Sequence, residues 1–176
     1  MRNWLLGIFL ISSIARAESL YDLKVGSTWT YQVEGGSSDT VTNSITGMQQ
    51  IQGKIWYKLV EYGDTFWVRN DDSGQIEAAN FFDSEPTPQD EPEEVLIYKY
   101  PAKAGETWDA DGTPITYKGL STVTVPAGTF DCHEYLIDMG PGFYSRSCIT
   151  AGIGVIYNEA VLEKGVKQVS RLVAYK

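Results

Sequence analysis

The chain has few of the side chains that carry enzyme chemistry. Its 176 residues include one histidine and two cysteines, fewer ligands than the four that a structural zinc site usually takes. It contains no Gly-x-Ser-x-Gly turn, phosphate-binding loop or dinucleotide-binding glycine pattern. His133 follows Cys132 directly, and neighbouring strand residues point to opposite faces, so the two should not form a catalytic dyad. We therefore expect no enzyme activity, no catalytic residue, no metal and no cofactor.

Long apolar runs are also missing, apart from one at the start. Trp4–Ile14 is an apolar stretch of 11 residues, about half the length needed to span a bilayer. Arg2 precedes it, and Ala15-Arg16-Ala17 fits a small-x-small cleavage site. We predict a signal peptide over residues 1–17, cleaved near Ala17, and one domain over 18–176 with no transmembrane segment. The protein would be periplasmic or secreted; an uncleaved membrane anchor is the less favoured alternative.

Positive charge is scarce as well. The net charge is −9, and removal of residues 1–17 takes away two arginines and no acid. An acidic surface repels nucleic acids and anionic lipids, so we expect no nucleic-acid partner. The acidity mainly favours solubility.

The two cysteines of an exported chain predict one disulfide, Cys132–Cys148. They flank a turn sequence, Met139–Gly142 (MGPG), and are equally distant from Gly140. A hairpin centred on Gly140 would place them opposite each other on neighbouring strands, at a separation that a disulfide can bridge.

Most of the chain alternates short β-prone runs with turn residues, and no segment has a sustained helical period. Connections this short favour antiparallel pairing. We predict an all-β fold with strands at Thr28–Glu34, Thr40–Thr46, Lys54–Tyr62, Thr65–Asn70, Gln75–Ala79, Glu94–Tyr100, Thr107–Ala110, Thr113–Tyr117, Leu120–Val125, Thr129–Asp138, Phe143–Ile149, Gly154–Ala160 and Lys167–Tyr175.

Two other features concern organisation. The acidic, proline-rich segment Asp83–Glu94 (DSEPTPQDEPEE) predicts a mobile loop by its composition, with a calcium or cationic-partner site as the less favoured interpretation. A pattern Tyr-x-x-Lys-x-Gly-x-Thr-Trp occurs at 21–29 and again at 100–108. If it marks a duplication, the sheet consists of two related halves.

The aromatic residues offer the remaining candidate site. With Gly63-Asp64 as a two-residue hairpin loop, Tyr57 and its strand neighbours of the same parity form an apolar core face. Trp56 and Trp67 then share the opposite, mixed face, which is either a groove for a ligand or a second packed layer. We take Trp56, Trp67 and Tyr98 as candidate ligand-binding residues.

Several motifs together resemble a group of uncharacterised bacterial exported domains, the domain-of-unknown-function 3108 type with the TapB family. They are Lys24–Trp29 (KVGSTW), the pair Ile55–Tyr57 and Trp67–Arg69, Val123–Cys132 (VTVPAGTFDC) and Gly152–Ile156 (GIGVI). The resemblance implies a curved antiparallel sheet that forms an open or half-closed barrel, like lipoprotein-carrier or lipocalin folds. It implies no established activity, and unlike many of that group this chain has no lipid-attachment cysteine.

These observations favour a non-enzymatic binding module for an apolar small molecule or an exported polypeptide. A structural or protein-interaction domain of the cell envelope is the alternative, with a sheet edge or the Asp83–Glu94 segment as the contact. A hydrolase is the least favoured reading, because His133 would be its only histidine base.

Overall fold

The computed structural model describes residues 19–36, 39–162 and 165–176. The predicted signal peptide lies outside these residues and stays a prediction. In the described part no helix is long and apolar enough to cross a membrane. Short runs rich in β-branched and aromatic residues pair through tight turns, and the all-β prediction is confirmed. The strands are β1 Thr28–Glu34, β2 Thr40–Ile51, β3 Lys54–Glu61, β4 Asp64–Asp71, β5 Gly74–Ala78, β6 Glu94–Lys99, β7 Thr107–Ala110, β8 Thr113–Val125, β9 Gly128–Asp138, β10 Tyr144–Thr150, β11 Gly154–Val161 and β12 Lys167–Tyr175.

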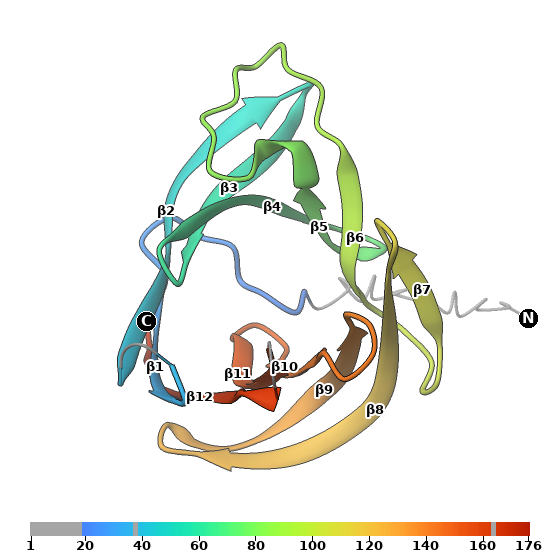
Figure 1. The fold of residues 1–176 in the computed structure, drawn as a ribbon. Coiled ribbons are helices and arrows are strands. Elements are labelled where there is room, and N and C mark those ends of the chain that lie inside the picture. Colours follow the sequence, from blue (N-terminus) through green and yellow to red (C-terminus); the bar gives the residue numbers. More distant parts are fainter. Residues whose placement is uncertain (1–18, 37–38, 163–164) are drawn as a thin grey trace, which may run out of the picture.

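All these strands belong to one antiparallel sheet in the order β6-β5-β4-β3-β2-β1-β12-β11-β10-β9-β8-β7. The sheet curls until its edge strands, β6 and β7, approach each other (Figure 1). No backbone ladder joins these two described strands. Instead the Trp108 indole N–H on β7 donates to the Leu96 carbonyl on β6 at 2.9 Å. The predicted half-closed barrel is therefore confirmed, with a seam between β6 and β7.

Two strands are longer than predicted. β8 is continuous over Thr113–Val125, where the sequence predicts two strands separated at Lys118-Gly119. Its pairing with β9 shifts between Tyr117 and Gly119, so the supposed turn is a bulge. β2 likewise continues past Thr46, with a shift between Ile45 and Gly47. A bulge bends a strand without ending it, which local turn preference alone does not distinguish from a turn.

The β3–β4 hairpin differs from the predicted register by two residues. Its turn is Tyr62-Gly63, and Trp67 pairs with Lys58 where the prediction placed it opposite Val60. Because side chains alternate with a period of two, this shift leaves every residue on its predicted face. Most of the Tyr57 face contributes to the main core inside the barrel, as expected. Ile55, which the prediction also placed in that core, is exposed near the start of β3.

The start of the described chain contributes to that core. Residues 19–27 lie across the barrel (Figure 1), and Leu20 and Tyr21 are buried among the strands. The Tyr21 carbonyl accepts a hydrogen bond from the Asn70 side chain at 2.9 Å, and the Ser19 carbonyl accepts one from the Gly152 N–H at 2.9 Å.

A second, smaller core lies on the other face of β3–β6, around Trp56 and Trp67. It is covered by residues 79–93, which we call the acidic strap; the strap begins with the 3₁₀ turn η1 (Ala79–Phe81). The Trp67 indole donates to the Ser84 carbonyl at 3.0 Å, and Gln49 donates to the Pro86 carbonyl at 2.7 Å. The segment after η1 is a loop, as its composition predicts, and hydrogen bonds attach its backbone to the sheet. Its predicted mobility stays a prediction.

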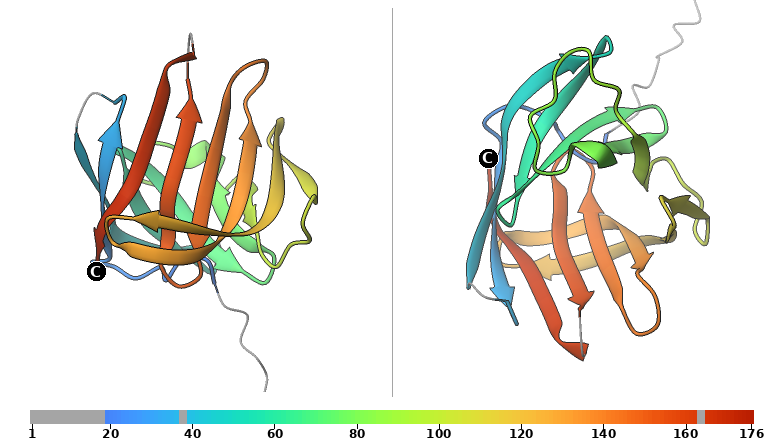
Figure 2. Two further views of the ribbon diagram at one scale, coloured as in Figure 1. Left: turned by 90° about the horizontal axis from the view of Figure 1, so that it is seen from below. Right: turned by 45° about the horizontal axis from the view of Figure 1, so that its top comes forward.

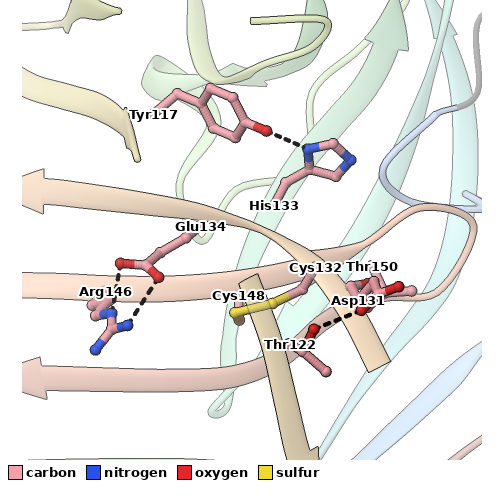
Figure 3. Close-up of a disulfide and its surroundings, with 9 residues drawn as sticks. All are labelled: Tyr117, Thr122, Asp131, Cys132, His133, Glu134, Arg146, Cys148 and Thr150. Carbon is pink, nitrogen blue, oxygen red and sulfur yellow. Dashed lines mark hydrogen bonds and ion pairs between the residues drawn. A yellow bond between two sulfur atoms is a disulfide. The ribbon is translucent and has the colours of Figure 1, made fainter. Parts of the chain in front are cut away.

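The far half of the β8–β9 hairpin crosses β10–β12, on the side away from β3–β5 (Figures 1 and 2). The Ala127 N–H donates to the Leu172 carbonyl of β12 at 3.0 Å. The predicted disulfide Cys132–Cys148 joins the hairpin to β10 (Figure 3). Its predicted geometry needs correction, because Cys148 pairs with Glu134 in the β9–β10 ladder. The disulfide is thus diagonal, with a Cα–Cα distance of 5.4 Å.

Candidate ligand-binding cavity

A cavity of about 210 Å³ lies inside the barrel beside the β3–β4 turn. Strands from different sides of the barrel contribute to it, and its lining is polar and aromatic. The lining comprises three tyrosines, one carboxylate, two amides, three serines and a valine: Tyr31, Tyr62, Tyr98, Glu61, Asn43, Asn158, Ser145, Ser147, Ser170 and Val155. A closed all-apolar core would not contain so many hydrogen-bonding groups.

Glu61, the last residue of β3, carries the only carboxylate in this lining. The Asn43 amide on β2 donates to Glu61 Oε1 at 2.9 Å. The oxygen of the same amide accepts the Tyr62 N–H at 3.2 Å, so Asn43 holds both the carboxylate and the adjoining turn. Burial raises the pKa of Glu61 to about 7, and the nearby negative charge of Glu77 adds to the rise. Glu61 therefore changes charge near neutral pH.

The three tyrosines keep their hydroxyls neutral and hydrogen-bonded. Tyr31 donates to the Val155 carbonyl at 2.8 Å, and the Tyr62 hydroxyl shares a hydrogen bond of 2.6 Å with Ser170. This second contact spans the barrel from the β3–β4 turn to β12. Burial raises the pKa of Tyr98 to about 12 and raises that of Tyr31 well above its usual value, with the Glu61 charge as a second cause.

The serines of β10 are held by an amide rather than by a base. Asn158 on β11 donates to Ser145 at 2.8 Å and to Ser147 at 2.9 Å. The third serine, Ser170, bonds Tyr62. None of these contacts pairs a serine hydroxyl with a proton acceptor of the kind that activates a nucleophile. The arrangement is suited to holding a molecule by hydrogen bonds.

The structure separates the residues that the sequence proposed as a site. Tyr98 lines the cavity, but Trp56 and Trp67 lie on the opposite face of the sheet, beneath the acidic strap, with exposed fractions of 0% and 2%. Arg69 packs over the Trp56 ring, 5.3 Å from its centre. Alternation along β3 and β4 placed the tryptophans together on one face, but it could not reveal that this face is covered.

Sequence reasoning also missed the cavity's main polar residues, Glu61, Asn43 and Asn158. One signal was present for Glu61, because alternation puts it on the same face as Tyr57 and Leu59. A carboxylate on an otherwise apolar face is unusual unless it has a partner or a role. No comparable signal marks the two asparagines.

The other candidates from the sequence lie elsewhere. His133 is on β9, where its Nδ1 and the Tyr117 hydroxyl share a hydrogen bond of 2.8 Å (Figure 3). Its ring also contacts Tyr100 edge to face, with 4.8 Å between the ring centres. Among the described residues, no group of three or more histidine, cysteine, aspartate or glutamate side chains could hold a metal ion.

No protein-family model and no curated protein matches the chain. Two solved structures resemble it. One, from Bacteroides fragilis, is described as an exported protein with a YmcC-like fold; it is 13% identical, with a TM-score of 0.53 over 92% of this chain and 100% of that one. The other, described as a lipoprotein from Parabacteroides distasonis, is 13% identical with a TM-score of 0.47 over the same shares.

The first likeness shows the fold. At 13% identity and a TM-score of 0.53, this chain shares the overall fold of that exported protein. At this identity the likeness transfers no site residue, and the domain-of-unknown-function 3108 and TapB resemblance is not confirmed, since no family model matches.

Proposed function

We propose that the protein is an exported, non-enzymatic binding domain that holds a small ligand, or one group of a larger ligand, in the cavity beside Glu61. The observation that carries this proposal is the polar lining inside the barrel, whose side chains are fixed by hydrogen bonds between different strands. Fixed polar groups in a concave site give orientation and specificity to a ligand. The disulfide supports an oxidising compartment outside the cytoplasm.

The size and lining of the cavity shape this proposal. Its volume of about 210 Å³ is below the roughly 300 Å³ at which pockets for drug-sized molecules begin. A large apolar ligand lying against Trp56 and Trp67 would need the acidic strap to leave the sheet. A small molecule or a single inserted group needs no such change.

A fragment screen by NMR on the mature protein tests the proposal. Ser145→Leu puts a larger side chain into the cavity lining, whereas Thr124→Leu introduces a leucine on an exposed stretch of β8. Fragments that shift the amide signals of Glu61 and Asn158 should bind at least 10-fold more weakly to Ser145→Leu and equally well to Thr124→Leu. If no fragment shifts these signals, or if both variants bind alike, the cavity is not the binding site.

A second candidate, a protein-interaction domain of the envelope, is favoured by the acidic strap. Its backbone is fixed against the sheet while Asp90, Glu91 and Glu93 are exposed. A fixed acidic surface suits a basic partner. Replacing these three residues by their amides should abolish capture of such a partner from envelope extracts and leave fragment binding in the cavity unchanged. Unaltered capture would eliminate the strap as the contact.

A further inference from the structure

We propose that the group held in the cavity is a protonated amine, with the Glu61 carboxylate as its counter-ion and the tyrosines around it. This inference rests on the proposed function and specifies the chemistry of the ligand. It is carried by the sign of the charge inside the barrel, by the free acceptors of the lining and by the aromatic rings beside them.

The charge around the cavity has one sign. Glu61 lines it and Glu77 lies near enough to repel the Glu61 charge, whereas no lysine, arginine or histidine is among the lining residues. Cationic side chains of the neighbouring strands have partners elsewhere. Lys58 pairs with Glu85 of the acidic strap, Lys167 with Glu159, and Arg171 with Glu34. A cation from outside would therefore supply the charge that this chain does not.

The hydrogen-bonding groups also favour a donor. Asn43 hydrogen-bonds one Glu61 oxygen, Oε1, and the second oxygen has no donor among the described residues. The Asn158 side-chain nitrogen donates to both serines of β10, and its side-chain oxygen accepts no hydrogen bond from the residues that the structure describes. An ammonium group has three donors and no acceptor, so it matches these two free acceptors.

The rings of Tyr31, Tyr62 and Tyr98 line the same space. Aromatic rings attract cations through the negative charge of their faces, and a carboxylate with several tyrosines is a favourable setting for an ammonium group. An anionic ligand would be repelled by Glu61. A purely apolar ligand would leave the charged carboxylate buried and unpaired, which is costly.

Binding should depend on pH, because a proton competes with the amine for Glu61. The titratable groups facing it are Glu77, Tyr21, Tyr31, Tyr62 and Tyr98; the tyrosine pKa values are all raised, mainly by burial. The tyrosines thus stay neutral between pH 5 and pH 8, whereas Glu61, with its pKa of about 7, changes charge in this range. Below the Glu61 pKa of about 7, affinity for an amine should fall by up to about 10-fold per pH unit.

The experiment is an NMR titration of the mature protein with butylamine, butanol and butyrate at pH 8 and pH 5. Butylamine should shift the amide signals of Glu61, Asn43 and Asn158 and bind at least 10-fold more tightly than the other two at pH 8. That preference should shrink at least 10-fold at pH 5. Glu61→Gln should remove it, and Glu34→Gln, a change of an exposed carboxylate on β1, should retain it.

The same titration separates the possible sources of the amine. A short peptide with one internal lysine is compared with the same peptide carrying norleucine, and with free butylamine. Tighter binding of the lysine peptide indicates an exported polypeptide as the source, whereas tighter binding of butylamine indicates a small molecule. The thermal melting of Glu61→Gln is measured alongside, so that loss of folding is not mistaken for loss of binding.

Two results would overturn the inference in distinguishable ways. If butanol or butyrate binds in the cavity as tightly as butylamine, the ligand is not an amine, but the cavity remains a binding site. If none of these compounds and no fragment of the wider screen shifts the cavity signals, both the amine inference and the proposed function fail.

Discussion

The first half of the barrel, β1–β6, and the second half, β7–β12, are each a six-stranded meander. Each follows one copy of the repeated Tyr-x-x-Lys-x-Gly-x-Thr-Trp pattern, and each has a long second hairpin with a bulge one residue before a glycine, Gly47 or Gly119. The two halves therefore share strand order and bulge position, and a duplication behind the repeat stays a prediction. What differs is how each half buries its long hairpin and what it places inside the barrel.

The two hairpins are covered by different means. In the first half the acidic strap lies over the face that carries Trp56 and Trp67, and hydrogen bonds and an ion pair between Lys58 and Glu85 hold it there. In the second half the hairpin itself folds against β10–β12 and is joined to β10 by the disulfide (Figure 2). The same meander can therefore cover the apolar face of its long hairpin in two ways. One half uses an inserted segment, and the other folds the hairpin onto neighbouring strands and fixes it with a disulfide.

The interior positions differ too. Leu59 and Tyr135 pair with the residue just before the bulge in their respective halves. Two residues further along β3 stands Glu61, and two residues further along β9 stands Ile137, which packs on the main core. One half thus supplies the cavity with a carboxylate where the other supplies an apolar side chain, and this asymmetry creates the candidate site.

The largest expected effect tests two glycines at matching places, Gly74 and Gly154, which begin β5 and β11. Both have positive φ, at 135° and 103°. A Cβ at Gly74 would lie 1.9 Å from the Tyr98 carbonyl oxygen, and one at Gly154 would lie 2.4 Å from the Tyr21 ring. Substitution by alanine should lower the free energy of unfolding by about 3 kcal/mol or more at each, and more at Gly74 because backbone yields less than a ring.

Urea unfolding measures these losses, with Gly53→Ala and Gly152→Ala as controls. Both control positions also have positive φ but open space around a Cβ, so they should lose only about 1–2 kcal/mol from backbone strain. If Gly154→Ala loses no more unfolding free energy than Gly152→Ala, the close packing of the Tyr21 ring against Gly154 is contradicted.

The next prediction concerns the disulfide of the second half. The cysteines are 16 residues apart, so replacing both by serine should lower the free energy of unfolding by about 3 kcal/mol. Hydrogen exchange should increase first in the far half of β8–β9, while the hairpin under the acidic strap keeps its protection. An equal loss of hydrogen-exchange protection in both hairpins would contradict the idea that the disulfide stabilises one hairpin and the acidic strap the other.

Glu61 gives the first half a pH dependence. Because its folded pKa of about 7 is above its ordinary value, its contribution to stability is fully present below pH 4.5 and is lost as pH rises through 7. Glu61→Gln should therefore raise the free energy of unfolding by roughly 3 kcal/mol at pH 8 and flatten its dependence between pH 5 and pH 8. Thermal melts of both proteins check this, and a steeper profile in the variant would contradict it.

The smallest effect separates the two junctions between the halves. Six residue pairs join β1 to β12, whereas the Trp108 side chain bridges β7 to β6. Trp108→Phe should cost about 1 kcal/mol for the lost hydrogen bond and increase hydrogen exchange in β6. Trp29→Phe, within the paired junction, should leave exchange in β12 unchanged because the backbone pairs remain. Faster exchange in β12 would mean that both junctions depend on their tryptophans.

The sequence by itself determined which residues form strands, which faces they share and which cysteines join. Alternation along β3 and β4 identified the faces correctly even though the register was two residues off, because a shift of two leaves each side chain on its side. Even the length and turn errors at Lys118 and Tyr62 are local ones.

Only the tertiary structure decided what covers each face and what meets inside the barrel. Glu61, Tyr98, Ser147 and Ser170 come from four strands that are separated along the chain, and their meeting depends on how far the sheet curls. The composition of the acidic strap likewise predicts a solvated loop, and only the structure shows that the strap covers Trp56 and Trp67. The alternation of residues along a strand indicates which face each side chain lies on. How far a sheet curls towards a barrel depends instead on the summed twist and bulges of all its strands.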